Sequence, residues 1–447
     1  MLSYPHLMSK AEGRRYVAGT TLTMDGYRPR LIEGRLDALL EAFGCVEVVG
    51  PKWCGKTWTA LSRAASVTRL DGARERQAAE VDPSLALIGD APHLVDEWQE
   101  VPEVWDAARR FVDDCGGRRG LLILTGSTSL SKARRRLVRH SGAGRIARLE
   151  MRPFSLREAG WATGNVSLSA LFAGKGLEPQ RGETSVRDVA RWCCRGGWPA
   201  SAELDYDASL EVPAQYIRAA LDVNVVEEGL SPEYAESLMK ALAFNASRSV
   251  TYETLLSDMA AYGAAPGCVD TMVSYLDVLR RLYLVEELPG WAPPMRAKER
   301  VRVRPKRYFV DPSLAAALLG ASEGGLLRDT QTLGDLFENL CLRELRICLS
   351  TYAGLGNQVS YYRDEKGLEV DFIVEHAGAW AGIEAKLSDA KIDQAAKNLV
   401  RLKDKVSGNP AARNAEPAFL AVLVGAGTMA YRRPDGVYVI PVAMLAP

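Results

Sequence analysis

Residues 45–65, CVEVVGPKWCGKTWTALSRAA, decide the fold of the N-terminal part of the chain. The stretch begins with a short apolar run, passes through a loop bounded by glycines and continues with apolar residues at helical spacing. This pattern predicts a strand, a tight turn and a helix. Its central part, GPKWCGKT at 50–57, fits the pattern G-x-x-x-x-G-K-[ST] completely, and the flanking elements are the context that this motif needs. The sequence therefore predicts a phosphate-binding loop.

The residues of this loop divide into a glycine backbone and side chains with chemical roles. Gly50 and Gly55 permit a backbone whose N–H groups turn inward around phosphates. Lys56 would reach the β- and γ-phosphates, and the Thr57 hydroxyl would bind magnesium. ATP and Mg²⁺ are therefore the expected cofactors. The other residues predicted to contact ATP are Pro51, Lys52, Trp53, Cys54 and Trp58.

Two acids follow a second apolar run, HLVDE at 93–97, about forty residues after the loop. This run and a third one, GLLILTGSTS at 120–129, predict buried strands of a parallel sheet, and their alternation with helices indicates an α/β unit. Asp96 would hold magnesium through water, and Glu97 would polarise the attacking water. A solvated turn is the alternative for these two acids.

Hydroxyl and basic residues at and after the third strand are further candidates for the site. Thr125 and Ser127 would lie next to the phosphates, where a hydroxyl can sense the γ-phosphate. Any of the following arginines can stabilise charge on the transferring phosphoryl group or contact a phosphate backbone, and a solvated basic face is the alternative. These arginines are Arg134, Arg135, Arg136, Arg139, Arg145 and Arg148.

The whole chain has 447 residues, which indicates two to four compact units. Lys plus Arg and Asp plus Glu both number 56, so a nucleic-acid surface would need local segregation of charge. No stretch approaches the roughly 20 apolar residues of a membrane span, and the first residues lack the apolar segment of a secretory signal. We expect a cytoplasmic protein with no membrane partner. The eight cysteines have no paired CxxC spacing, so neither a structural zinc site nor a disulfide framework is expected.

The pattern of predicted elements divides the chain into four segments. Residues 1–154 form the α/β core around the loop, and residues 155–230 are mostly helical, as a lid or linker. Residues 231–325 read as three helices and a β-ribbon, the order of a winged helix. After a glycine-rich linker, a helix, three strands, a helix and a last strand over residues 326–447 predict a separate α/β domain.

A basic run falls where the hairpin of the winged helix should project. It carries a single acid, Glu299, and predicts contact with DNA phosphates without sequence preference; a solvated hairpin or a protein-contact surface is the alternative. Asp270 and Asp277, on the outer face of the preceding helix, argue against base reading in the major groove. The basic residues are Arg296, Lys298, Arg300, Arg302, Arg304, Lys306 and Arg307.

Acidic residues of the last segment form a second candidate site. Glu338 lies on its first helix, and Asp371 lies in the strand LEVDF. Glu384 and Lys386 are two apart in the strand IEAK and therefore share one face, beside which an adjacent strand can bring Asp371. Carboxylates can hold Mg²⁺, while Lys386, which is not a ligand, orients water or neutralises charge on a phosphodiester. By position, these four residues resemble the PD-(D/E)XK nuclease core; an inactive or purely DNA-binding version of that fold is the alternative.

Five stretches together resemble the bacterial and archaeal AAA+ type ATP-binding proteins that carry a C-terminal domain of unassigned function. The resemblance spans nearly the whole chain and implies an ATPase module, a helical lid, a winged helix and a restriction-endonuclease-like end domain. It also implies nucleotide binding by the loop glycines, Lys56 and Thr57, hydrolysis by Asp96 and Glu97, and an arginine finger at Arg145. The stretches are GYRPRLIEGRLDALLEAF, GPKWCGKT, HLVDEWQEVPEVW, LTGSTS and GRIARLEMRPFSLRE.

The sequence thus favours a magnesium-dependent ATPase coupled to DNA binding through the winged helix and the nuclease-like domain. Two alternatives stay open at this point. One is a nucleotide-switched protein-interaction module that cuts nothing, and the other is an active magnesium-dependent DNA nuclease. A homo-oligomer is a further expectation, because the arginine that completes the ATP site can come from a neighbouring copy.

Overall fold

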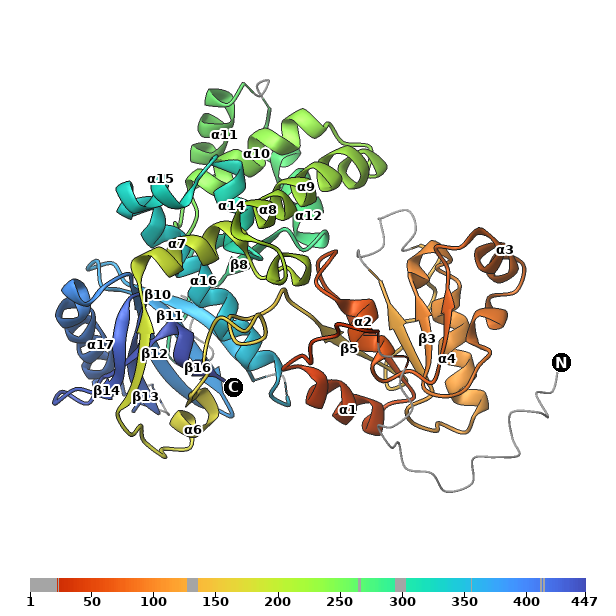
Figure 1. Ribbon diagram of the computed structural model, residues 1–447, viewed down its shortest axis with the longest axis horizontal. Coiled ribbons are helices and arrows are strands. Elements are labelled where there is room, and N and C mark those ends of the chain that lie inside the picture. Colours follow the sequence, from red (N-terminus) through yellow and green to blue (C-terminus); the bar gives the residue numbers. More distant parts are fainter. Residues whose placement is uncertain are drawn as a thin grey trace. The chain divides into compact units, whose positions relative to one another are not determined.

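The computed structural model divides into two compact units (Figure 1). The first comprises Met1–Gly50 and Gly55–Met151, and the second comprises Pro51–Cys54 and Arg152–Pro447. The residues that the structure describes are 22, 24–126, 136–263, 267–293, 303–354, 356–410, 412 and 415–447.

A five-stranded parallel sheet forms the centre of the first unit, with strand order β2-β3-β4-β1-β5. The α/β class and the parallel sheet predicted from sequence are confirmed. The apolar runs become strands because both faces of a parallel sheet are buried, and every residue of β1, β3 and β4 is buried. The strands are β1 (Cys45–Val49), β2 (Ser66–Arg69), β3 (His93–Asp96), β4 (Leu122–Thr125) and β5 (Ile146–Glu150).

Helices cover this sheet. Trp105, Ala108 and Val112, at three- and four-residue spacing on α4, pack in one core with Cys45 and Leu122 of the sheet. The helices are α1 (Glu33–Ala42), α2 (Lys56–Leu61), α3 (Ala73–Val81) and α4 (Val104–Asp114), with short 3₁₀ turns η2 (Pro83–Leu87) and η3 (Trp98–Glu100).

The second unit begins with two short strands and a series of helices. Side-chain caps start several of these helices, such as the capping box of Ser185 and Asp188 on α7. The elements are β6 (Val166–Ser167), α6 (Leu168–Phe172), β7 (Gln180–Thr184), α7 (Val186–Arg195), η4 (Pro199–Ala202), α8 (Tyr206–Ser209), α9 (Glu211–Ala219) and the π-helical turn η5 (Ala220–Val225).

Three helices and an antiparallel ribbon follow, in the order that the sequence predicts for residues 231–325. In the ribbon, Val285 pairs with Phe309 and Leu288 with Lys306. The elements are α10 (Pro232–Phe244), α11 (Tyr252–Ala261), α12 (Val269–Arg281), β8 (Val285–Leu288) and β9 (Lys306–Phe309), and then α14 (Pro312–Leu318), α15 (Glu323–Arg328) and α16 (Thr330–Ser350).

A seven-stranded mixed sheet with order β10-β11-β12-β13-β15-β14-β7 organises the C-terminal part. Its edge strand β7 comes from the segment predicted to be a helical lid, and Gly427 of β14 pairs with Thr184 of β7. The helical description of residues 155–230 is therefore incomplete. The remaining elements are β10 (Gln358–Arg363), β11 (Glu369–His376), β12 (Ala379–Lys386), η6 (Asp389–Lys391), α17 (Ile392–Ser407), β13 (Phe419–Val424), β14 (Gly427–Arg432), β15 (Tyr438–Pro441), η7 (Val442–Met444) and β16 (Leu445–Ala446).

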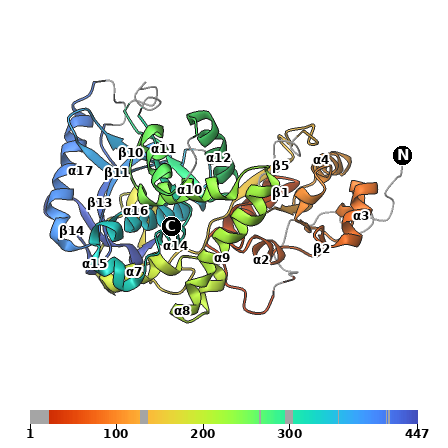
Figure 2. The ribbon, with the colours of Figure 1, turned by 90° about the horizontal axis from the view of Figure 1, so that it is seen from above.

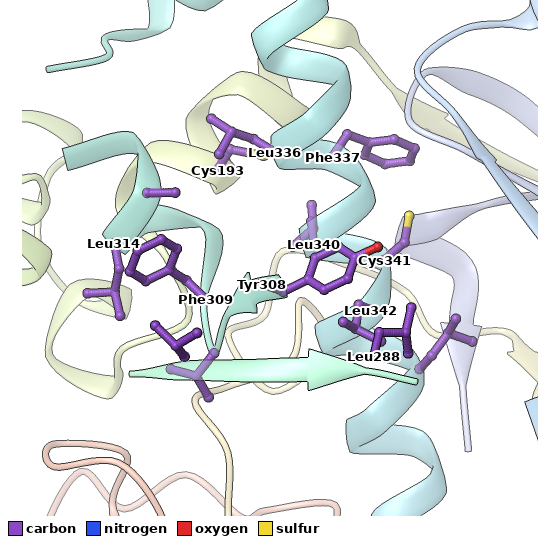
Figure 3. Packing of buried hydrophobic residues seen from close by; sticks show 14 of the residues in the cluster. Cys193, Leu288, Tyr308, Phe309, Leu314, Leu336, Phe337, Leu340, Cys341 and Leu342 are labelled. Carbon is purple, nitrogen blue, oxygen red and sulfur yellow. The ribbon is translucent and has the colours of Figure 1, made fainter. Parts of the chain in front are cut away.

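The helices α16 and α17 lie on opposite faces of this sheet (Figures 1 and 2). Alternate strand residues face each helix, as the two-residue period of a strand requires. Phe372 packs in the core that contains Phe337 of α16 (Figure 3), whereas its neighbour Ile373 packs in the core that contains Leu399 of α17. Within the described part of the chain, no helix combines the length and the hydropathy that a membrane span needs.

Candidate functional site

The predicted phosphate loop connects β1 to α2, as expected from its sequence. Gly50 has a φ of 143°, and a Cβ at this position would lie 2.2 Å from the carbonyl oxygen of Met151. Gly55 caps α2 in the left-handed region with a φ of 96°. Both glycines are thus required by backbone geometry. The buried Lys56 donates a hydrogen bond from Nζ to the Gly50 carbonyl oxygen at 3.0 Å, which holds the ammonium inside the loop.

The other predicted contact residues of the loop differ in exposure. Pro51 and Cys54 are buried, Lys52 is half-buried, and Trp53 and Trp58 are exposed. Cys54 is therefore placed for packing.

A hydroxyl–carboxylate network joins the loop to the ends of two strands. The Thr57 hydroxyl donates to Oδ1 of Asp96 at 3.0 Å, and the Thr125 hydroxyl donates to the same oxygen at 2.5 Å. Asp96 and Thr125 face each other because β3 and β4 pair in parallel with these residues in register. Burial raises the pKa of Asp96, and the two hydroxyl hydrogen bonds oppose this rise. The structure therefore brings Thr57, Asp96 and Thr125 together.

Glu97 follows directly in a left-handed backbone conformation with a φ of 56°. Its carboxylate accepts a hydrogen bond from the Gln99 side-chain amide. A Cβ on Gly126 would lie 2.6 Å from Oε1 of Gln99, so the chain after β4 passes close to this pair. Gln99 was not predicted from the sequence. The signal that could have indicated it is a side-chain amide two residues after Glu97. Ser127 lies outside the described residues, as do Arg134 and Arg135.

Arg145 and the loop lie at opposite ends of the parallel strands. It directly precedes β5, and β5 pairs in parallel with β1 so that Ile146 faces Cys45, the first residue of β1. The loop follows the last residue of β1, about 16 Å away at a rise of about 3.3 Å per residue. Arg145 instead pairs with Asp113, with Nε 2.8 Å from Oδ1. A finger role within its own copy is therefore not supported, and a role in a neighbouring copy stays a prediction.

The predicted carboxylates of the second unit lie around lysines. Nζ of Lys386 is 3.0 Å from Oδ2 of Asp371 and 2.5 Å from Oε2 of Glu384. The Ala385 N–H donates to the same oxygen of Asp371 at 2.9 Å. These contacts arise because β11 and β12 are antiparallel neighbours, as the sequence suggests, and because Glu384 and Lys386 share a face.

A second lysine, which comes from the ribbon, completes the cluster. Lys306 on β9 places Nζ 3.0 Å from Oε1 of Glu338 and 2.7 Å from Oε1 of Glu369. The Tyr308 hydroxyl donates to the same Glu338 oxygen at 2.5 Å. We call this group the carboxylate–lysine cluster; it consists of Lys306, Tyr308, Glu338, Glu369, Asp371, Glu384 and Lys386.

The position of Lys306 corrects one prediction from the sequence. Lys306 and Arg307 were expected on an exposed wing, but both are buried, and Arg307 pairs with Glu287 at 3.2 Å. Their charges are directed into the protein because each finds a carboxylate partner there. Arg304 is exposed. The rest of the basic run, Arg296, Lys298, Arg300 and Arg302, lies outside the described residues.

The electrostatics of the cluster follow from burial and from the two ammonium groups. Burial by itself raises the pKa of Asp371, but the charges of Lys386 and Lys306 outweigh burial and lower this pKa to about 2. Burial raises the pKa of Glu338 to about 7 in spite of Lys306. Burial and the charge of Asp371 raise the pKa of Glu384. Among the described residues, no group of three or more His, Cys, Asp or Glu side chains is arranged to hold a metal ion.

Comparison with protein families supports the first site. A model described as an AAA domain matches residues 43–160, which contain the loop, Asp96 and Glu97. Residues 43–160 form an AAA-family ATPase domain. Two further models, described as domains of unknown function (DUF8612 and DUF4143), match residues 186–324 and 333–445.

Solved structures show more distant similarity. The chain is similar to the Walker-type ATPase PABY2304 of Pyrococcus abyssi, with 14% identity, a TM-score of 0.42, and coverage of 68% of this chain and 99% of that chain. It is also similar to a variant of RuvB of Thermotoga maritima, with 16% identity, a TM-score of 0.25, and coverage of 62% of this chain and 94% of that chain. No curated protein matched the chain.

The AAA domain and the carboxylate–lysine cluster differ in what the sequence analysis found. In the AAA domain, the loop, Asp96, Glu97 and Thr125 were all identified from local pattern. In the cluster, Lys306, Tyr308 and Glu369 were missed. Lys306 and Tyr308 are two residues apart on one strand and share a face, which is the signal that could have paired them.

Proposed function

We propose that the AAA domain is a magnesium-dependent ATP hydrolase. The observation that carries this proposal is the 3.0 Å hydrogen bond between Thr57 and Asp96. It brings a loop hydroxyl and a strand-end carboxylate together, and these oxygen groups suit Mg²⁺. A magnesium ion held there would supply positive charge that neutralises the phosphate groups of ATP. Thr57 and Asp96 are the residues that we expect to hold it.

The remaining residues act on ATP and water. Lys56, which contacts the Gly50 carbonyl at 3.0 Å, would exchange this contact for a phosphate oxygen. Glu97 would accept a proton from the attacking water, as a general base at the end of β3. Gln99 is a positioning residue because its amide holds the Glu97 carboxylate.

Three variants test this proposal by ATP retention and turnover. Lys56→Ala should lose ATP retention, because the loop loses the ammonium group that is held inside it. Glu97→Gln should retain ATP and hydrolyse it about 10²- to 10⁴-fold more slowly, as loss of a general base predicts. Glu103→Gln, which removes an exposed carboxylate just before α4, is the matched control and should behave as wild type. Wild-type turnover by Glu97→Gln would remove the base role from Glu97, and wild-type ATP retention by Lys56→Ala would refute the site.

We also infer that the second unit is a nucleotide-switched binding module that does not cut DNA. Two observations favour this alternative over an active nuclease. The carboxylates expected to hold Mg²⁺ are paired with Lys306 and Lys386, and Lys306 and Arg307 are withdrawn from the surface on which DNA phosphates would lie. DNA contact by this module would rest on Arg304 and the rest of the basic run.

Binding and cleavage assays on the full chain separate the possibilities. Affinity for duplex or single-stranded DNA that falls steeply between 50 and 200 mM salt would assign DNA as the partner. No affinity for either form would leave a protein partner. Cleavage of DNA with Mg²⁺ that is lost in Asp371→Ala would overturn the inference of a non-cutting module.

A further inference from the structure

The middle of the phosphate loop, Pro51–Cys54, belongs to the second compact unit, whereas the rest of the loop belongs to the first. We call these four residues the loop tip. Tyr216 on α9 belongs to the same unit as the loop tip, so contacts between them are contacts within one unit. No residue of α9 was predicted from the sequence to take part in the ATP site.

Two kinds of contact join Tyr216 to the loop tip. The rings of Trp53 and Tyr216 meet edge to face, with centroids 5.3 Å apart and an interplanar angle of 81°. This arrangement is favourable because the positive edge of one ring meets the negative face of the other. Burial raises the pKa of Tyr216, and a hydrogen bond from the Lys52 backbone opposes this rise. One side chain thus contacts two consecutive residues of the loop tip.

The rest of the second unit fixes the Tyr216 ring. Tyr216 is 4% exposed, and its ring stacks on that of Trp198 with centroids 4.6 Å apart. The Trp198 indole N–H donates to Oγ of Ser313 at 3.0 Å, and this hydroxyl donates to Oδ1 of Asp311 at 2.6 Å. The other carboxylate oxygen of Asp311 lies 2.7 Å from Arg343. Because all five residues are buried, Tyr216 presents a fixed surface to the loop tip.

The backbone of the loop tip depends on such a surface. Trp53 has a φ of 62°, in the left-handed region that bulky residues rarely adopt. Its side chain is exposed, so burial in a core does not fix this conformation. A residue other than glycine persists in this region only when its surroundings hold it there. The contacts with Tyr216 supply this constraint.

We propose that Tyr216 is a positioning residue that holds the loop tip in the conformation that binds ATP. A loop that is ordered before binding loses less conformational entropy when the ligand arrives, so its affinity is higher. Tyr216 acts through Trp53 and Lys52, and it should therefore change the affinity for ATP and not the chemical step. This inference rests on the proposed ATP hydrolase function and assigns the order of the loop tip to α9.

ATP affinity and turnover of the full chain test the proposal. Tyr216→Leu should raise the Kd for ATP at least about tenfold, because it removes both the ring contact and the hydrogen bond. The kcat at saturating ATP should change by less than about twofold, as expected when only uniform binding is lost. Trp53→Ala should also weaken ATP binding. Adding it to Tyr216→Leu should cause little further loss, because the two changes remove the same contact.

Tyr275→Leu is the matched control for Tyr216→Leu. Tyr275 is also buried, its ring contacts that of another tyrosine, and its oxygen accepts a hydrogen bond from the Ser231 backbone N–H at 2.9 Å. It lies on α12, and its partners lie outside the loop tip. The ATP affinity of Tyr275→Leu should therefore equal that of wild type.

Hydrogen exchange of the nucleotide-free chain provides a second measurement. The amides of residues 52–58 should exchange at least about threefold faster in Tyr216→Leu than in wild type or Tyr275→Leu, because the loop tip has lost its support. The proposal would be overturned by unchanged or tighter ATP binding in folded Tyr216→Leu, by an equal loss in Tyr275→Leu, or by additive losses in the double variant. Unchanged exchange of the loop amides would also overturn it.

A second variant covers the case in which Tyr216→Leu does not fold by circular dichroism. Tyr216→Phe keeps the stacked ring and removes only the hydrogen bond with Lys52, so it should weaken ATP binding about fivefold. Wild-type affinity in Tyr216→Phe would overturn the proposal. Failure of the wild type itself to retain ATP would refute the proposed hydrolase function, whereas exchange of the loop amides without nucleotide tests the role of Tyr216 separately.

Discussion

The phosphate loop and the carboxylate–lysine cluster are built in opposite ways. The loop consists of eight consecutive residues that follow β1. Its partner Asp96 is the last residue of β3, which belongs to the same sheet as β1. The cluster draws on four elements, β9, α16, β11 and β12, whose residues span positions 306–386. A site made of consecutive residues can be recognised from its pattern, whereas a site made by packing depends on which strands and helices become neighbours.

The two sites also differ in how their charges are compensated. In the loop, Lys56 contacts a backbone carbonyl, which a ligand phosphate can replace. In the cluster, buried carboxylates and ammonium groups neutralise one another, so removal of one partner leaves a buried charge. Substitutions in the loop should therefore change ligand binding more than stability, and substitutions in the cluster should do the reverse.

The largest expected effect is that of Asp371→Ala. This change removes one of the two carboxylate acceptors of Lys386 and the acceptor of the Ala385 N–H, and loss of one partner of a buried pair typically costs about 3–5 kcal/mol of unfolding free energy. Urea denaturation, with hydrogen exchange of β11 and β12, measures the loss. ATP turnover should stay unchanged.

The exposed pair of Glu416 and Lys403 provides the matched control for Asp371→Ala. Glu416→Ala should change stability little, because exposed ion pairs contribute little. Equal effects of the two substitutions would mean that the cluster is solvated, and the contrast between the two sites would fail.

Local pattern predicted much of the AAA domain. β1, β3 and β4 read as apolar runs because a parallel sheet buries both faces, and the phosphate-loop motif fixes its own flanking elements. The alternation of Glu384 and Lys386 likewise placed both side chains on one face. In the phosphate loop and in the pair of Glu384 and Lys386, the residues that act together are only a few positions apart in the sequence. In the parallel sheet, the strand geometry brings the strand ends together.

Long-range pairing explains what local pattern did not predict. β7 pairs with β14 across more than two hundred residues, and its sequence QRGET carries no apolar run because it is an edge strand. Lys306 and Arg307 looked like an exposed wing because basic runs are usually solvated, and only the positions of Glu338 and Glu287 show otherwise. The pairing of β5 with β1 places Arg145 at the end of the strands that is far from the loop, and this pairing cannot be read from local pattern.

An intermediate effect is expected for Tyr308→Phe, which tests whether the ribbon helps to hold the cluster. The tyrosine hydroxyl donates to Glu338, and hydrogen bonds to charged groups contribute about 2 kcal/mol to stability. Tyr234→Phe is the matched control, because in the described residues the buried Tyr234 hydroxyl has no hydrogen-bond partner. Urea denaturation should show a loss for Tyr308→Phe alone. A loss of the same size in both variants would show that the contact with Glu338 is not the cause.

The smallest expected effect concerns His93, which is the first residue of β3, whereas Asp96 is the last. Burial lowers the pKa of His93 below its ordinary value of 6.5. The ring is hydrogen-bonded to Ser66, Thr68 and the Ala86 carbonyl. As the pH falls through 6.5, the unfolded chain takes up a proton that the folded chain does not, so the unfolding free energy decreases.

His93→Gln should remove this contribution, so the melting temperature of wild type should fall more than that of the variant between about pH 7.5 and 5.5. Titrating carboxylates are common to both proteins and cancel in the difference. ATP retention at about pH 7.5 should be equal in the two proteins, because His93 and Asp96 occupy opposite ends of β3. A melting-temperature difference that does not change with pH would show that His93 takes no part in acid sensitivity. A loss of ATP retention would instead show that the loop depends on residues at the opposite end of the strands. The contrast between a local site and an assembled one would then weaken.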